Sequence, residues 1–82
     1  MSNATDSRLS PQNEKLMAWL KAQRINKGLN MRDLGARLNT AHSRIGKYEN
    51  CDRRLDVGEY FEVCAAIGCD PFAGLRLVYG GE

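Results

Sequence analysis

The chain has 82 residues, of which 43% are apolar and 27% are charged, and its net charge is +2. This length is enough for one compact core and too short for a second domain, and the composition is that of an ordinary globular protein. No apolar run approaches the roughly 18 residues of a membrane span, and no secretory signal opens the chain, so we expect a soluble cytoplasmic protein.

Residues 1–9 are polar and show no apolar periodicity, which predicts a flexible N-terminal tail. Ser2-Asn3-Ala4 is typical of a remnant left by recombinant expression and is excluded from the functional reasoning. The folded domain is therefore expected to be 10–82.

The first predicted helix begins at Ser10-Pro11, because serine caps a helix and proline fits its first turn. Gly28 can adopt the left-handed conformation that ends it. Its apolar side chains predict a core helix and are Leu16, Met17, Trp19 and Leu20.

Two short helices joined by a turn are predicted between Asn30 and Glu49. The apolar residues there are Leu34, Leu38, Ile45 and Tyr48. The spacing within each pair is helical, but the gap from Leu38 to Ile45 is too long for one amphipathic helix. This pattern is typical of a helix-turn-helix, in which the second helix is presented to DNA.

The first helix of this pair is expected to be capped by Asn30 and Asp33, with Met31, Leu34 and Leu38 pointing inward. A glycine inside a helix costs roughly 1 kcal/mol relative to alanine, so Gly35 predicts that another helix passes close to it.

Asn39 tolerates the left-handed turn conformation, and Thr40 is expected to cap the next helix by accepting from the Ser43 N–H. That helix is predicted from Ala41 to about Glu49. Its Gly46 suggests close access to the preceding helix or to a DNA backbone.

A fourth helix is predicted after a cap formed by Asp56 and Glu59, ending at Gly68, and a fifth after Asp70-Pro71. The residues expected to face the core from the fourth helix are Val57, Tyr60, Phe61, Cys64, Ala65 and Ile67. Apolar residues recur in the fifth at Phe72, Leu75, Val78 and Tyr79. The prediction is thus an all-α fold of five helices.

The basic residues are concentrated around the predicted helix-turn-helix. Residues 21–54 hold nine Lys or Arg against three Asp or Glu, a charge of +6, whereas the rest of the chain holds three against seven, a charge of −4. This concentration of positive charge is typical of a protein that binds a phosphate-bearing partner, and the alternative interpretation is a solvated charged face.

The sequence offers no catalytic or metal constellation. His42 is the single histidine, and Cys51, Cys64 and Cys69 lack the spacing of a zinc site. We expect two half-buried thiols and one at a helix end, with redox sensing as the alternative. No enzyme activity, cofactor, metal or small-molecule ligand is predicted.

Taken together, these residues resemble the Cro/C1-type (Xre-like) helix-turn-helix proteins of phage and bacterial repressors, which have a lambda-repressor-like fold. The resemblance covers about Leu16 to Leu77. The matching residues, in chain order, are Arg24, Gly28-Leu29-Asn30, Leu34-Gly35, Leu38, Ile45, Lys47-Tyr48-Glu49, Arg53-Arg54-Leu55-Asp56 and Gly68-Cys69-Asp70-Pro71.

The resemblance implies that the third helix lies in the major groove of double-stranded DNA. The implied base contacts are His42, Ser43, Arg44 and Lys47, and the implied phosphate contacts are Asn30, Arg32, Asn50, Arg53 and Arg54. It also implies an ion pair between Arg24 and Glu49 that joins the first helix to the third, in place of two solvated side chains.

The chain departs from the family pattern at three positions. Met31 stands where glutamine commonly reaches a phosphate, which leaves Arg32 as a substitute. Asn39 replaces the usual glycine of the turn. Cys51 replaces the glycine that usually follows the third helix, so the left-handed role there is expected to fall to Asn50.

One such domain reads few base pairs, so a homodimer is expected, with Phe72, Leu75, Val78 and Tyr79 as its surface unless these residues close the monomer core. The predicted function is a sequence-specific transcriptional regulator, in particular a repressor. The alternative is a protein-interaction module, such as an antitoxin-like or coregulator partner with the same fold.

Overall fold

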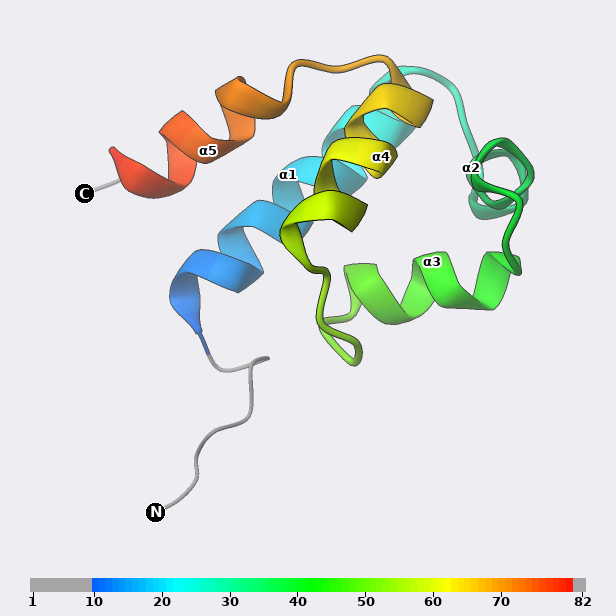
Figure 1. The fold of residues 1–82 in the computed structure, drawn as a ribbon, viewed down its shortest axis with the longest axis horizontal. Coiled ribbons are helices and arrows are strands. Elements are labelled where there is room, and N and C mark those ends of the chain that lie inside the picture. Colours follow the sequence, from blue (N-terminus) through cyan, green and yellow to red (C-terminus); the bar gives the residue numbers. More distant parts are fainter. Residues whose placement is uncertain (1–9, 81–82) are drawn as a thin grey trace.

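The computed structural model describes residues 10–80, which form five α-helices and no strand. The helices are α1 (Pro11–Asn26), α2 (Met31–Leu38), α3 (His42–Glu49), α4 (Val57–Ile67) and α5 (Pro71–Tyr79) (Figure 1). The predicted all-α, five-helix fold is confirmed for this part of the chain. The expected N-terminal tail lies outside the described residues.

Local capping explains where most of the helices begin. The side chain of Ser10 accepts a hydrogen bond from the Asn13 N–H, and that of Asp70 accepts from the Phe72 N–H. The predicted reciprocal caps are both present, in the pairs Asn30/Asp33 and Asp56/Glu59. Each satisfies N–H groups that the first turn of a helix leaves without partners.

The predicted cap of α3 is wrong. Ala41, not Thr40, is the N-cap residue, and no side chain caps this helix. Thr40 lies one position too early because its N–H donates to the Gly35 carbonyl, 2.8 Å away, within the tight turn. Asn39 has the expected left-handed conformation, with φ of 56°.

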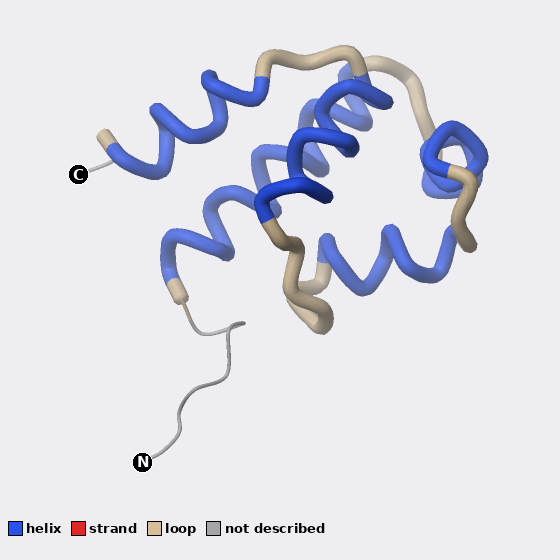
Figure 2. Tube along the Cα trace, viewed as in Figure 1, coloured by secondary structure: helices blue, strands red, loops and turns tan. Residues whose placement is uncertain are grey.

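The loop that joins α3 to α4, residues 50–56, is the longest connection between described helices (Figure 2). The left-handed residue in it is Cys51, with φ of 62°, and not Asn50, with φ of −87°. The expectation for Asn50 is therefore wrong. Cys51 thus adopts the left-handed backbone conformation typical of the usual glycine, although it carries a side chain.

The core is formed by one face of each of the first four helices. Its buried apolar residues are Met17, Leu20, Leu34, Ile45, Tyr48, Tyr60, Val63, Cys64 and Ile67. Leu16, Trp19, Met31 and Leu38 are half-buried and pack against this cluster. In Figure 1, α2 is seen almost end-on while α3 runs across the view, so these two helices are steeply crossed.

The predicted core face of α4 is only partly correct. Tyr60, Cys64 and Ile67 are buried together with Val63, a spacing that forms a single helical stripe. The side chains of Val57, Phe61 and Ala65 are exposed. These three lie four residues apart and so form the adjacent stripe, which turns away from α1 and α2.

Helix α5 packs through a glycine. A Cβ atom at Gly74 would lie 2.6 Å from Trp19 Cζ3 and 2.5 Å from Tyr60 Oη, so α5 can approach this closely only without a side chain there. Gly74 is the only residue of α5 that is buried. The large apolar side chains of α5 are therefore left on the outside of the molecule.

Candidate nucleic-acid interface

Gly35 allows α2 to meet the start of α3. A Cβ atom at this position would lie 2.8 Å from the Thr40 carbonyl oxygen and 3.3 Å from the His42 Cα. The predicted close approach is thus made by the turn and the first residue of α3. Gly46 differs, because its nearest neighbour across the helix pair is the Met31 sulfur, which would be in ordinary contact with a Cβ at 3.5 Å.

A buried ion pair joins α1 to the end of α3. Arg24 Nε donates to Glu49 Oε2 over 2.6 Å and Nη2 donates to Oε1 over 3.0 Å, and both side chains are 7% exposed. Arg24 Nη1 also donates to the Leu29 carbonyl over 2.8 Å. The hydrogen bond with Glu49 raises the pKa of Arg24. The pair that the resemblance implied is therefore present and holds α3 against α1.

The outward face of α3 carries three of the four residues implied to contact bases. His42, Ser43 and Lys47 are exposed. Arg44 is half-buried and turned toward α4: its Nε donates to Tyr48 Oη over 2.8 Å, and its Nη2 donates to Glu59 Oε2 over 2.9 Å. Sequence patterns did not predict this arrangement.

Glu59 is the centre of a polar cluster between α3 and α4. Its Oε1 accepts the capping hydrogen bond from the Asp56 N–H, while its Oε2 accepts from Tyr48 Oη over 3.1 Å and lies 3.6 Å from Arg53 Nη2. The capping N–H of Asp56, followed by Tyr48 and Arg44, holds the pKa of Glu59 below its usual range. Glu59 was predicted only as a helix cap, because its sequence neighbours give no indication of these long-range partners.

A polar hollow of about 360 Å³ opens beside this cluster and is lined by Ser43, Arg44, Lys47, Asp52 and Arg53. Three of the five lining side chains are cationic and one is acidic. An open hollow with excess positive charge suits an anion, and guanidinium groups match the geometry of a phosphate.

The other residues implied to contact phosphates lie on two segments. Asn50 and Arg54 are exposed in the α3–α4 loop, the same loop that brings Arg53 to the hollow. Asn30 and Arg32 are exposed at the start of α2. The Asn30 side chain is already engaged in capping, where it accepts from the Asp33 N–H.

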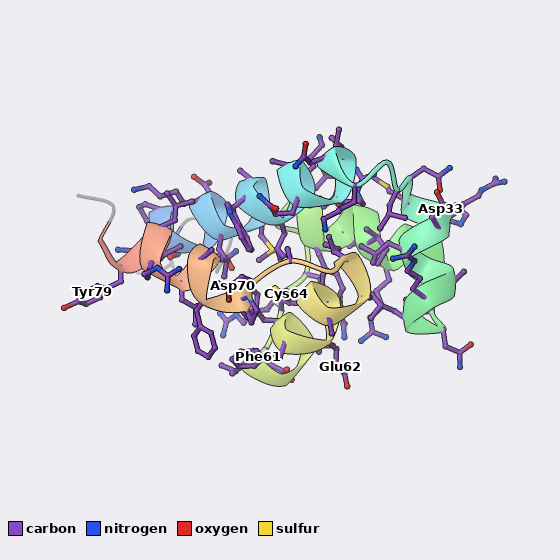
Figure 3. The ribbon with its side chains drawn as sticks, turned by 90° about the horizontal axis from the view of Figure 1, so that it is seen from above. Asp33, Phe61, Glu62, Cys64, Asp70 and Tyr79 are labelled. Carbon is purple, nitrogen blue, oxygen red and sulfur yellow. The ribbon has the colours of Figure 1, made fainter. Side chains whose placement is uncertain are left out.

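An apolar surface lies apart from this polar face. Phe72 is 58% exposed, Leu75 40% and Tyr79 94%, whereas Val78 is half-buried. Phe61 of α4 extends the surface, because its ring centroid lies 6.2 Å from that of Phe72 in an edge-to-face contact. Figure 3 shows Phe61 and Tyr79 at the periphery of the molecule, with Cys64 enclosed between helices.

Cys51, Cys64 and Cys69 form no disulfide among residues 10–80. Cys64 is fully buried, and burial raises its pKa to about 12, while burial also raises the pKa of the half-buried Cys69. Cys51 is half-buried in the loop after α3. Raised pKa values favour the protonated thiol, which is a poor metal ligand and nucleophile.

Comparisons with known proteins also indicate a helix-turn-helix protein. A family model described as HTH_3, helix-turn-helix, matches residues 20–73. The structure of an XRE-family like protein from Pseudomonas syringae pv. tomato str. DC3000 is 36% identical, with a TM-score of 0.84 over 98% of each chain. The clp gene regulator ClgR from C. glutamicum is 22% identical and has the same fold, with a TM-score of 0.77 over 88% of this chain and 94% of that one. The search of curated proteins gave no match.

Proposed function

This chain belongs to the HTH_3 family of Xre-type helix-turn-helix proteins, which are DNA-binding transcription regulators, and on this premise we propose that it is a sequence-specific repressor. It would read the major groove of double-stranded DNA with α3. The observation that supports this most directly is the row of exposed polar side chains on α3 beside a cationic hollow. Among residues 10–80, no helix is long and apolar enough to cross a membrane.

Base contacts are proposed for His42, Ser43 and Lys47. A major groove admits one α-helix, and lysine can donate to guanine O6 or N7 there, while histidine and serine can donate or accept. Arg44 was the fourth predicted base contact. Its guanidinium is turned toward α4, and a base contact that drew it away from there would break its hydrogen bonds to Tyr48 and Glu59.

Backbone contacts are proposed for residues on both sides of α3. Asn50, Arg53 and Arg54 come from the α3–α4 loop, and Asn30 and Arg32 come from the start of α2, where helix N–H groups also favour an anion. Such contacts set the register of α3 on the duplex without reading sequence.

A homodimer is proposed as the DNA-binding form, since two recognition helices about 34 Å apart would read two half-sites on one face of the duplex. Phe72, Leu75, Val78 and Tyr79 of α5 would form its surface, with Phe61 beside them. Burying exposed aromatic side chains favours association in water. Phe72→Ser should therefore give a monomer in sedimentation equilibrium while the helical content stays unchanged.

Selection of bound sequences from a random duplex pool tests DNA reading. We expect one enriched motif, bound with an affinity that falls steeply with salt. Lys47→Ala should weaken binding far more than Lys21→Ala, which removes the same charge from the exposed side of α1. Equal effects of the two substitutions, or no enriched motif, would contradict the proposal. A promoter carrying the motif should then be less active when the chain is present.

The exposed aromatic residues of α4 and α5 also support a second candidate, a module that binds another protein through this surface. The two functions differ in which variants lose activity. A partner protein that is lost on Phe72→Ser but retained on Lys47→Ala, with no DNA motif enriched, would favour the interaction module.

A further inference from the structure

Building on the proposed function, we propose that Glu59 is a positioning residue of the DNA-binding surface. It holds Arg44 and Arg53 together beside Tyr48, so that their remaining N–H groups face the hollow and bind one backbone phosphate there. Arg44 then contacts the DNA backbone, and sequence reading is left to His42, Ser43 and Lys47.

The carboxylate of Glu59 is itself held in place. Its Oε1 is fixed 3.0 Å from the Asp56 N–H by the cap that starts α4, and the backbone of Glu59 is fixed by the reciprocal bond to Asp56 Oδ1. Oε2 is consequently directed at the side chains of α3 and the α3–α4 loop. A helix cap thus becomes the anchor of a tertiary cluster.

The two arginines are arranged around one ring. The guanidinium carbons of Arg44 and Arg53 each lie 5.8 Å from the centroid of Tyr48. Two like charges at one ring repel each other, and the carboxylate that lies 2.9 Å from one and 3.6 Å from the other offsets this repulsion. Tyr48 stays in place because its ring is buried in the core.

Arg44 can keep these bonds and still bind a phosphate. A guanidinium has five N–H groups, and Arg44 uses one on Nε and one on Nη2, which leaves Nη1 and the second Nη2 proton available. The side chains of Arg44 and Arg53 are 39% and 45% exposed, and both line the hollow together with Lys47. A phosphate oxygen in this hollow would meet cations already in position.

A base contact by Arg44 is less favourable. It would remove a charged partner from Glu59, whose side chain is 24% exposed, and leave the Tyr48 hydroxyl without its donor from Arg44. Partly buried polar groups that lose their partners weaken binding. A phosphate contact needs no such exchange.

Glu59→Gln separates positioning from capping. Glutamine is accepted at the third position of a capping box, so the start of α4 is retained, while the charge between the two arginines is removed. Glu62→Gln is the matched control, because it makes the same charge change on the same helix. Glu62 is exposed and makes no hydrogen bond or ion pair among residues 10–80, although it lines a second hollow beside Arg44, and its side chain points outward (Figure 3).

The measurement is anisotropy on the selected duplex at several salt concentrations. Removing a negative charge alone would leave binding unchanged or tighten it in both variants. Positioning predicts that Glu59→Gln binds about fivefold more weakly than Glu62→Gln. It also predicts that Arg44→Ala has a smaller effect in the Glu59→Gln background than in the wild type. Tyr48→Phe, which removes the hydroxyl that accepts from Arg44, should weaken binding in the same direction.

The DNA-free protein supplies a second readout. In wild type and Glu62→Gln, the Arg44 Nε–H should give a separate NMR signal that exchanges slowly with water, and Glu59→Gln should lose it. Urea unfolding checks that all variants are folded.

Binding by Glu59→Gln that equals or exceeds that of Glu62→Gln would overturn the proposal, since Glu59 would then be a bystander or a competitor of the phosphate. Additive effects of Arg44→Ala and Glu59→Gln would do the same. A wild-type chain that binds no duplex refutes the proposed function instead, and the phosphate site with it.

Discussion

The buried ion pair between Arg24 and Glu49 predicts a large loss of stability when either partner is removed. Both side chains are 7% exposed and share two hydrogen bonds, so Arg24→Met or Glu49→Leu would leave one charge buried without its counter-ion. Breaking such a pair costs about 3–5 kcal/mol. A small domain is stable by about 5–15 kcal/mol, so each variant should lose about a fifth or more of its stability.

The double variant Arg24→Met/Glu49→Leu should be more stable than the two single losses predict. With both charges gone, no buried charge is left unpaired, and the coupling energy, the sum of the two single losses less the loss of the double variant, should be about 5–9 kcal/mol. A residual loss of about 1 kcal/mol is expected, because the Leu29 carbonyl also loses its donor from Arg24.

Urea unfolding followed by circular dichroism at 222 nm measures these free energies. Arg76→Met is the control, since Arg76 lies 3.7 Å from Asp70 with both side chains more than half exposed, and its loss should cost less than about 1 kcal/mol. Single variants that cost no more than this control, or strictly additive losses, would refute the idea that the pair is desolvated and joins α1 to α3.

Three further predictions follow from the same structure. Gly35→Ala should lower the free energy of unfolding measured in urea, because its Cβ would lie 2.8 Å from the Thr40 carbonyl oxygen. Gly46→Ala should leave this free energy unchanged or raise it by up to about 1 kcal/mol, and the reverse order would contradict the packing described for α2 and α3. Cys64 should resist iodoacetamide in the folded protein at pH 8 and react only on unfolding, because it is fully buried with a pKa of about 12; rapid modification detected by mass spectrometry would show that α4 opens. The pKa of Glu59 is lowered in the folded state, so its contribution to stability is present above the unfolded pKa of about 4.3 and is lost as the pH falls through the folded pKa. The urea midpoint of the wild type should therefore drop more steeply on acidification than that of Glu59→Gln. Parallel curves of midpoint against pH would contradict this.

Helix starts were predictable because capping is local. A serine, asparagine or aspartate accepts an N–H two or three residues further along the chain, so Ser10, Asn30, Asp56 and Asp70 carry this information in their immediate neighbours. The exception is α3, whose start depends on how the turn folds back on Gly35, and here Thr40 was assigned wrongly as the cap.

Side-chain burial was less predictable than helix positions. In α4, two adjacent stripes are both rich in apolar residues, so periodicity alone could not tell that Val63 is buried and Phe61 is exposed. The choice between stripes depends on the angle at which α4 crosses α1 and α2. Helix α5 adds a further constraint, because contact through Gly74 sets the direction in which Phe72 and Tyr79 point.

The sequence by itself determined the five helices, the caps of four of them, and the candidate residues of α3. These features can be predicted from the sequence because they depend on hydrogen bonds and apolar spacing within a few residues of the chain. Only the tertiary structure decided that Arg44 turns toward α4 and meets Arg53 at Glu59, fifteen and six residues away along the chain. Partners this distant are brought together by the packing of α3 against the rest of the core, which no local pattern records.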